Sequence, residues 1–257
     1  MDNTIESLGE QLYRALRDRR TVPPLGGRVA NIDVDMAYQI SETMLRRRLA
    51  DGEKIIGRKI GVTSKAVQDM LGVHQPDFGT LTDAMRSGPV MPISTRLIQP
   101  KAEGEIAFVL SRDLCGPGVT PEQVLAATAT VHPCFEIVDS RIEGWKIGIE
   151  DTIADNASSG MFVVGAGVSP VGLDLEGCRM DVWKNGGHLS TGYGRAALGS
   201  PLASVAWLVN TLGRRGVPLR AGEWVLSGSL VPLEPVRAGD QVALSIDGIG
   251  GVEVAFG

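Results

Sequence analysis

Cysteine and histidine are scarce in this sequence, with three of each among 257 residues. Cys115, Cys134 and Cys178 are odd in number and widely spaced, so they predict neither a disulfide framework nor a cysteine-rich zinc site. Unpaired cysteines of this kind are typical of a reducing compartment. We therefore expect a fold that does not depend on disulfides.

Long apolar runs and an excess of basic residues are also missing. No stretch approaches the roughly 18 uncharged apolar residues of a membrane helix, and the first residues lack the basic and apolar segments of a signal peptide. The formal net charge of −5 argues against a nucleic-acid groove, which needs clustered Lys and Arg. The expectation is a cytoplasmic protein that binds neither membranes nor nucleic acid.

The composition that remains is that of an ordinary globular protein, with 43% hydrophobic and 21% charged residues. Apolar residues at helical spacing predict helices over 4–19 and 35–50. Beyond Ile55, short apolar runs separated by glycine predict strands near 55–60, 103–111, 134–139, 161–165, 179–184, 224–228, 241–247 and 251–256. This order predicts an α+β protein with a mainly helical N-terminal region, 1–70, and a β-rich domain, 71–257.

Turn and capping residues mark several element boundaries. Asn-Gly at 185–186 and Asp-Gly at 247–248 predict two hairpins, because these pairs tolerate the positive φ angles of tight turns. The segment 120–123 reads as a capping box with proline at the first helical position, and Ser-Pro at 200–201 opens a second, strongly apolar helix.

Three glutamates fall where a charged side chain is unexpected. Strand alternation over 103–110 places Glu103 and Glu105 on a face that continues with apolar residues, and Glu136 has apolar neighbours on both faces. A buried, unpaired carboxylate costs several kcal/mol, so a positive partner is expected. That partner is either an Arg or Lys or a divalent cation. Among cations, Mg²⁺ or Mn²⁺ suits this all-oxygen set.

Five motifs occur in an order that resembles the 2-keto-4-pentenoate hydratases of aromatic meta-cleavage pathways, members of the fumarylacetoacetate hydrolase superfamily. The resemblance covers nearly the whole chain. The motifs are GRKIGVTS (57–64), QPDFG (75–79), EGEI (103–106), EIVDSR (136–141) and ADNAS (154–158). The fold that this resemblance implies is a mixed β-roll with a small helical N-terminal part, assembled as a homo-oligomer.

The resemblance also implies an activity and a site. The expected reaction is metal-dependent hydration of 2-hydroxypenta-2,4-dienoate, or a close homologue, to 4-hydroxy-2-oxopentanoate, with 71–257 as the catalytic domain. The substrate would be a small 2-hydroxy-dienoate or 2-oxo acid chelated to Mg²⁺ or Mn²⁺. The implied residues are the metal ligands Glu103, Glu105 and Glu136, the catalytic residues Lys59 and Asp77, and the substrate-binding residues Ser158, Ser227 and Ser229.

Two of these residues have specific expected roles and plain structural alternatives. Asp77 is a candidate general base or proton shuttle, and Lys59 a candidate partner for the enolate or carboxylate of the substrate. The alternatives are a turn aspartate, because Pro-Asp-x-Gly is a common turn sequence, and a structural ion pair for the lysine.

Other functions remain open from the sequence. Hydrolytic members of the superfamily usually carry a catalytic His after the Gly-Arg motif. Residues 58–73 contain none, which argues against a carbon-carbon hydrolase. The related 4-oxalocrotonate decarboxylases share the metal motifs but tend to have Leu where Arg58 stands and an apolar residue where Asp77 stands. The second alternative is a non-catalytic partner subunit, since members of this family can associate with a homologous decarboxylase.

Overall fold

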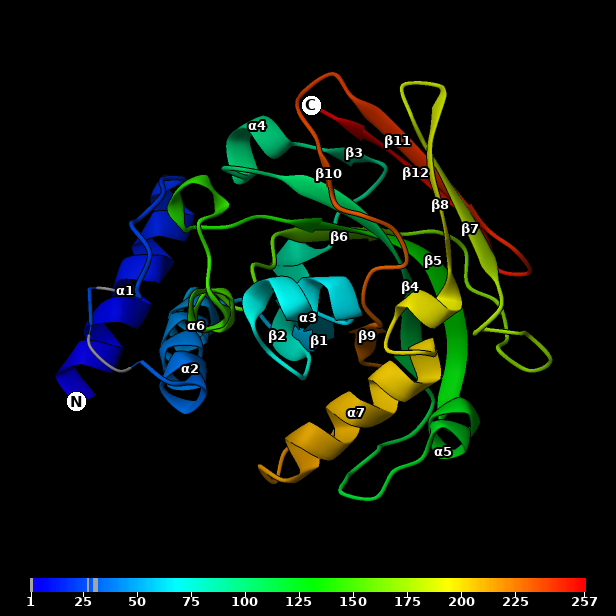
Figure 1. Ribbon diagram of the computed structural model, residues 1–257, viewed down its shortest axis with the longest axis horizontal. Coiled ribbons are helices and arrows are strands. Elements are labelled where there is room, and N and C mark those ends of the chain that lie inside the picture. The colour runs from blue at the N-terminus through cyan, green and yellow to red at the C-terminus, as the bar shows by residue number, and fades with distance from the viewer. Residues whose placement is uncertain (1, 27, 30–31) are drawn as a thin grey trace.

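Two long helices form the N-terminal part of the protein. We describe it from a computed structural model that covers residues 2–26, 28–29 and 32–257. Helices α1 (Asp2–Asp18) and α2 (Val34–Ala50) pack against each other because their apolar residues recur at helical spacing, and they bury Leu12 and Ile40 completely. Both helices predicted for this region are confirmed. In Figure 1 they lie at the opposite end of the molecule from the C-terminal strands.

The body of the protein consists of two sheets. The first is a curled, seven-stranded mixed sheet in the order β2, β1, β9, β4, β5, β6, with β10 paired to β4. Its strands are β1 (Ile55–Gly61), β2 (Asp77–Thr82), β4 (Lys101–Leu110), β5 (Thr128–Val138), β6 (Met161–Val164), β9 (Trp224–Leu226) and β10 (Glu234–Pro235). The second sheet has the order β3, β12, β11, β7, β8. Its strands are β3 (Val90–Met91), β7 (Arg179–Lys184), β8 (Gly187–Tyr193), β11 (Gln241–Ile246) and β12 (Gly250–Phe256).

The main hydrophobic core includes the residues packed between the two sheets. Ile106 and Phe108 of β4 belong to it together with Met180 of β7. Gly104 allows β4 to approach β7 closely, since a Cβ at this position would lie 2.5 Å from Met180 Sδ. Strand alternation then turns the neighbouring Glu103 and Glu105 to the other face of β4. The core therefore fixes the direction in which these carboxylates point.

Short helices connect the strands. They are α3 (Lys65–Leu71), α4 (Ile93–Arg96), α5 (Pro121–Ala126), α6 (Ile149–Ala154) and α7 (Pro201–Gly213), with 3₁₀ turns at Asp83–Met85, Glu143–Trp145 and Gly194–Ala196. The capping box predicted for α5 is present: Thr120 Oγ1 accepts from Gln123 N and Gln123 Oε1 accepts from Thr120 N. The two predicted hairpins are also confirmed, as the pairs β7–β8 and β11–β12.

Helix α7 ends a segment that contradicts the expectation of no stretch close to a membrane helix. The segment Gly194–Gly213 has the length and composition of a membrane-spanning helix. Its apolar residues nevertheless lie in the main core, where Val205, Leu208 and Val209 are fully buried. Packing inside the protein thus accounts for its hydropathy.

The predicted fold class is confirmed, because the described residues form an α+β protein with mixed sheets and a helical N-terminal part. Strand β1 lies before residue 71 yet pairs with β2 and β9. The division into regions 1–70 and 71–257 remains a prediction.

Candidate metal centre

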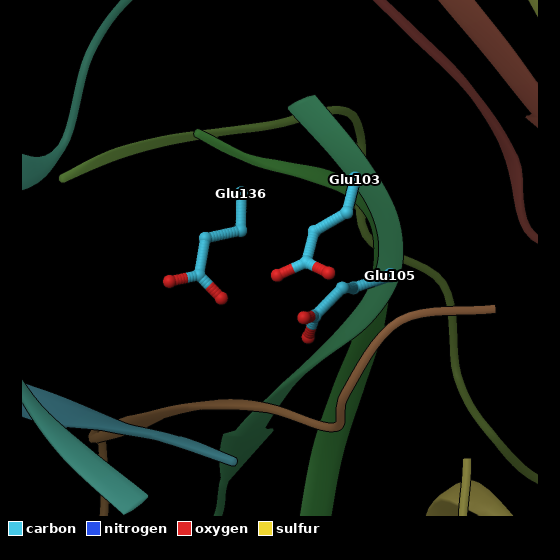
Figure 2. A group of neighbouring side chains, drawn as sticks. All are labelled: Glu103, Glu105 and Glu136. Atoms are coloured by element: carbon cyan, nitrogen blue, oxygen red, sulfur yellow. The ribbon is translucent and has the colours of Figure 1, made fainter. Parts of the chain in front are cut away.

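Three glutamates meet on one face of the curled sheet. The antiparallel pairing of β4 with β5 sets Glu103 opposite Glu136 and Glu105 opposite Cys134. Ligand atoms of the three carboxylates all lie within 4.8 Å of one another, and Figure 2 shows the carboxylates turned toward a common point. The structure therefore brings together the three residues expected to bind metal.

These carboxylates are enclosed and poorly satisfied. Glu105 and Glu136 are buried, and Glu103 is half-buried. Glu105 Oε2 accepts a hydrogen bond from Gly228 N (2.8 Å), but Glu105 Oε1 and both oxygens of Glu136 have no hydrogen-bond partner within the described residues. Burial raises the pKa of all three carboxyl groups, to about 7 for Glu136, and neighbouring carboxylates raise that of Glu105 further.

Lys59 supplies a positive charge next to this cluster. Its buried Nζ lies 3.2 Å from Glu136 Oε1 and donates a hydrogen bond to Ala157 O at 2.9 Å. Burial alone would lower the pKa of this ammonium group, but the surrounding carboxylates, Glu136 foremost, raise it above its ordinary value. One lysine faces the carboxylates of Asp77 and the three glutamates. The ion pair that we gave as the structural alternative for Lys59 is therefore present. It still leaves an excess of negative charge, because one ammonium group faces several carboxylates.

The donor set fits a divalent cation. The unpartnered oxygens are hard ligands of the kind that Mg²⁺, Mn²⁺ and Ca²⁺ prefer, and among the described residues no histidine or thiol ligand takes part in the cluster. Cys134 stands opposite Glu105 on the neighbouring strand, but burial and the nearby carboxylates raise the pKa of its thiol well above the ordinary value. A protonated thiol is a poor metal ligand.

Asp77 begins strand β2 and is fully buried. Neither of its carboxylate oxygens has a hydrogen-bond partner in the described part of the chain. The opposite residue on β1 is Gly61, where a Cβ would lie 2.3 Å from Asp77 Oδ1 and 3.5 Å from Lys59 Nζ. Glycine thus leaves room for the carboxylate beside the lysine. Burial raises the pKa of Asp77, and the charge of Lys59 partly offsets this rise.

Ser158 lies in a loop with unusual backbone geometry. Asn156, Ala157 and Ser158 have consecutive positive φ angles of 55°, 52° and 50°, a conformation that is costly for residues other than glycine. The hydroxyl of Ser158 is buried without a described hydrogen-bond partner. The same loop provides the carbonyl of Ala157 that Lys59 contacts.

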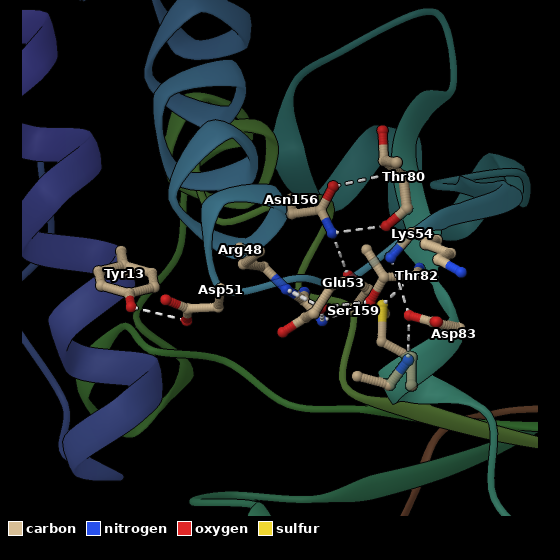
Figure 3. Close-up of polar contacts among 12 residues, drawn as sticks. Tyr13, Arg48, Asp51, Glu53, Lys54, Thr80, Thr82, Asp83, Asn156 and Ser159 are labelled. Atoms are coloured by element: carbon tan, nitrogen blue, oxygen red, sulfur yellow. Dashed lines mark hydrogen bonds and ion pairs between the residues drawn. The ribbon is translucent and has the colours of Figure 1, made fainter.

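Residues not singled out from the sequence hold this loop. Fully buried Arg141 donates from Nε to Asp155 Oδ1 (2.5 Å), from Nη2 to Asp155 O (2.6 Å) and from Nη1 to Ser159 O (2.8 Å). Asn156 pairs with the main chain of Thr80 on β2 at 2.7 and 2.9 Å, as Figure 3 shows. Arg141 and the Asp-Asn pair lie in two of the motifs noted above, but spacing alone does not show that they bond to each other.

The loop after β9 contains the other two predicted substrate-binding residues, and they differ in whether the hydroxyl group has a hydrogen-bond partner. Ser227 Oγ is buried without a described hydrogen-bond partner. Ser229 Oγ donates to Val231 O at 2.6 Å, so its proton is used within the loop. Gly228, between them, has a φ of 98° and directs its N–H to Glu105. The geometry favours Ser227 over Ser229 as a group free to contact a ligand.

A cavity of about 300 Å³ opens next to the segment that leads into Asp77. It is lined mainly by apolar side chains of α2 and α6 and by residues 73–76, among them Tyr38, Pro76 and Ile153. Tyr38 stacks on Phe78 of β2 with ring centroids 4.5 Å apart. A small organic molecule can be accommodated in a cavity of this size and lining.

The fold and the site together define a mixed β-roll protein with a buried carboxylate centre. The family model for the C-terminal part of fumarylacetoacetate (FAA) hydrolase matches residues 59–256. The chain therefore belongs to the fumarylacetoacetate hydrolase family, as the motifs implied.

Individual relatives show the same relationship over most of the chain. A 2-hydroxyhexa-2,4-dienoate hydratase of Comamonas testosteroni is 56% identical, covering 98% of this chain and 97% of the relative. A 2-hydroxypent-2,4-dienoate hydratase of Pseudomonas putida is 64% identical, covering 84% of this chain and 100% of the relative. Among solved structures, a 4-oxalocrotonate decarboxylase of Pseudomonas putida G7, complexed with magnesium and adipate, superimposes with a TM-score of 0.95 at 34% identity, covering 100% of this chain and 98% of that one.

Proposed function

We propose that this protein is a metal-dependent hydratase that converts 2-hydroxypenta-2,4-dienoate, or a homologue with a slightly longer tail, to the corresponding 4-hydroxy-2-oxo acid. The observation that carries this proposal is the buried cluster of Glu103, Glu105 and Glu136 beside Lys59 and Asp77. The hydratases reported above, at 56% and 64% identity, support the choice of reaction.

The three glutamates would hold one divalent cation, for which we propose Mg²⁺ or Mn²⁺. When bound, the cation supplies Lewis-acid chemistry that orients the substrate's 1-carboxylate and 2-oxygen and favours negative charge on that oxygen. The magnesium bound in the related decarboxylase structure supports this choice of metal class.

The protein's own groups would manage charge and protons around the substrate. Hydration requires a proton to move from the 2-hydroxyl to C5, which gives a conjugated 2-oxo-3-enoate. Water then adds its oxygen to C4 and a proton to C3. Lys59, whose pKa is raised and which is therefore cationic at neutral pH, would stabilise negative charge on the 2-oxygen during both steps.

Asp77 is the proposed proton carrier. Its carboxylate is buried, lies beside Lys59 and has no described hydrogen-bond partner, so it is available to relay a proton between oxygen and carbon. Burial raises the pKa of Asp77, which makes its carboxylate a stronger base than an exposed aspartate. Ser158 and Ser227 remain proposed contacts of the substrate carboxylate, with Ser229 as the weaker member of the predicted set.

Decarboxylation of 4-oxalocrotonate is the second candidate, favoured by the overall similarity to the solved decarboxylase. The two reactions need the same chelating head but differ at the tail, where the decarboxylase substrate carries a second carboxylate. Arg58 and Asp77 match the hydratase pattern rather than the decarboxylase pattern. A buried carboxylate at 77 also makes a second negative charge nearby unfavourable.

The decisive experiment offers both substrates to the magnesium-loaded protein. Loss of the ultraviolet absorbance of 2-hydroxypenta-2,4-dienoate, with 4-hydroxy-2-oxopentanoate identified by NMR, is the expected result. Release of CO₂ from 4-oxalocrotonate in place of hydration would assign the decarboxylase reaction. Turnover of neither substrate would favour a non-catalytic partner subunit.

The assembly and location of the protein stay predictions. We expect a homo-oligomer in the cytoplasm and a possible complex with a homologous decarboxylase. Light scattering of the purified protein, alone and mixed with such a decarboxylase, measures both associations.

A further inference from the structure

A second depression, of about 190 Å³, lies where the ends of α1 and α2 meet the start of β6. Its lining shares no residue with the carboxylate centre, and it is rich in arginine. The charged residues that line it are Arg17, Arg19, Arg48, Arg96 and a single carboxylate, Glu53.

Two of these arginines are neutralised within the protein. Glu53 Oε1 accepts from Arg17 Nη2 (2.8 Å) and Glu53 Oε2 accepts from Arg48 Nε (2.9 Å). Arg17 also pairs with Asp51, and Arg48 donates to Thr82 Oγ1 at 2.8 Å. Figure 3 shows the contacts among Arg48, Glu53 and Thr82, between the end of α2 and the end of β2. The side chains of Arg48 and Glu53 are the buried part of this network, and they lie at the bottom of the depression.

The other two arginines have no acidic partner. No carboxylate among the described residues lies within 4.0 Å of a nitrogen of the Arg19 or Arg96 guanidinium, and their recorded side-chain hydrogen bonds go to main-chain carbonyls. Arg19 Nη1 donates to Ser94 O (2.5 Å), and Arg96 Nη2 donates to Ala84 O (2.8 Å). These bonds hold each guanidinium in place but use only one of its five N–H donors. The depression therefore has an excess of two positive charges.

The backbone of Arg19 adopts a conformation that is unusual for an arginine. It follows the last residue of α1 with a φ of 51°, the left-handed conformation in which helices usually end on glycine. A cation is favoured near a helix C-terminus, which accounts for one arginine there. It does not account for the gathering of four arginines from separate segments around one small hollow.

We infer that this depression binds a compact dianion, such as inorganic phosphate or a short dicarboxylate. Guanidinium groups bind oxyanions through paired N–H donors, and two unneutralised arginines match two negative charges. The exposed positions of Arg19 and Arg96 leave the hollow accessible to a solute from solvent. Its volume suits a small ion.

A bound dianion would connect parts of the protein that matter for the carboxylate centre. Gly160 and Met161 line the hollow, and Met161 pairs with Ile137, the residue after Glu136. The loop that carries Ser158 ends at the same place. Because the anion binds the folded protein, its occupancy of the hollow should stabilise that state by mass action.

The test is calorimetric titration of the magnesium-loaded protein with phosphate and, separately, with succinate at low ionic strength. We expect saturable binding of at least one of them. Each of Arg19→Gln and Arg96→Gln should weaken it about tenfold, which corresponds to about 1.4 kcal/mol. The probe that binds more tightly shows whether the site prefers a phosphate or a dicarboxylate. Arg112→Gln is the matched control, because Arg112 is exposed and does not line the hollow.

Two outcomes would overturn the inference. One is the absence of binding by both anions at millimolar concentration. The other is binding that persists unchanged in the Arg19→Gln, Arg96→Gln double variant, which would place the anion at the carboxylate centre or elsewhere. Thermal melting in chloride buffer checks that the variants fold, and the charge-retaining Arg96→Lys, which lacks the planar fork, should show intermediate affinity.

Discussion

Replacing Arg141 by methionine tests how the protein maintains the strained loop at its carboxylate centre. Arg141 is fully buried and makes three side-chain hydrogen bonds, two to Asp155 and one to Ser159. Removing one partner of a buried ion pair costs about 3–5 kcal/mol, because the other charge stays buried and unpaired. That is a large part of the roughly 5–15 kcal/mol of a typical domain.

A double-mutant cycle separates the ion pair from the loop geometry. In Arg141→Met, Asp155→Asn neither member of the pair leaves its own charge buried and unpaired, so the double variant should recover much of the stability lost in Arg141→Met alone. Turnover should not recover, because the carbonyls of Asp155 and Ser159 still lack their donor and the loop carrying Ala157 and Ser158 can relax. Urea unfolding measures the stability, and the dienoate absorbance assay measures the turnover.

An exposed pair provides the control. Arg179 and Asp181 are 2.8 Å apart with the arginine side chain half exposed, and Arg179→Met should change the stability little, because solvent screens the pair. If Arg141→Met proves equally mild, or if the double variant regains full turnover, the idea that this pair fixes the active loop is wrong.

Three further predictions concern the charges around the carboxylate centre. Asp77→Asn should lower kcat at least about a hundredfold while metal affinity is retained, as a lost proton carrier does; near-normal turnover removes Asp77 from the mechanism. Lys59→Met should lower kcat and leave metal binding intact or tighter, because a competing positive charge is removed; unchanged kcat and KM would exclude the assigned role. Burial raises the pKa of Glu136 from 4.5 to about 7. The metal-free protein should therefore lose about 3 kcal/mol of stability as the pH rises from about 4.5 to about 7. Magnesium affinity should increase over the same pH window. Thermal melts with and without Mg²⁺ follow both effects, and pH-independent stability of the metal-free protein would contradict the assignment.

Much of the fold could be predicted because its signals are local. Alternating apolar residues, Asn-Gly at 185–186 and the Thr120 capping box each act within a few residues, and the predicted hairpins and α5 are present. Strand β2 was not predicted as a strand, since Asp77, Gly79 and polar threonines interrupt the apolar pattern. Its place in the sheet comes from pairing with β1, a contact that sequence spacing does not show.

The candidate site was predictable in composition and not in arrangement. The alternation over β4 correctly gave Glu103 and Glu105 a common face, but only the register of β4 with β5 places Glu136 opposite Glu103. The loop at 156–158 could not be anticipated, because left-handed backbone at non-glycine residues is imposed by tertiary contacts such as the Arg141 hydrogen bonds.

The most direct test of the proposed metal-dependent activity is a metal titration of the stripped protein. Protein freed of divalent ions should have no hydratase activity, and adding Mg²⁺ should restore turnover of 2-hydroxypenta-2,4-dienoate up to one equivalent per chain. In Glu105→Gln the restoration should require far more magnesium, whereas Glu253→Gln, on the exposed surface of β12, should behave as the unmodified protein. Full turnover without metal, or restoration indifferent to Glu105, would contradict the account.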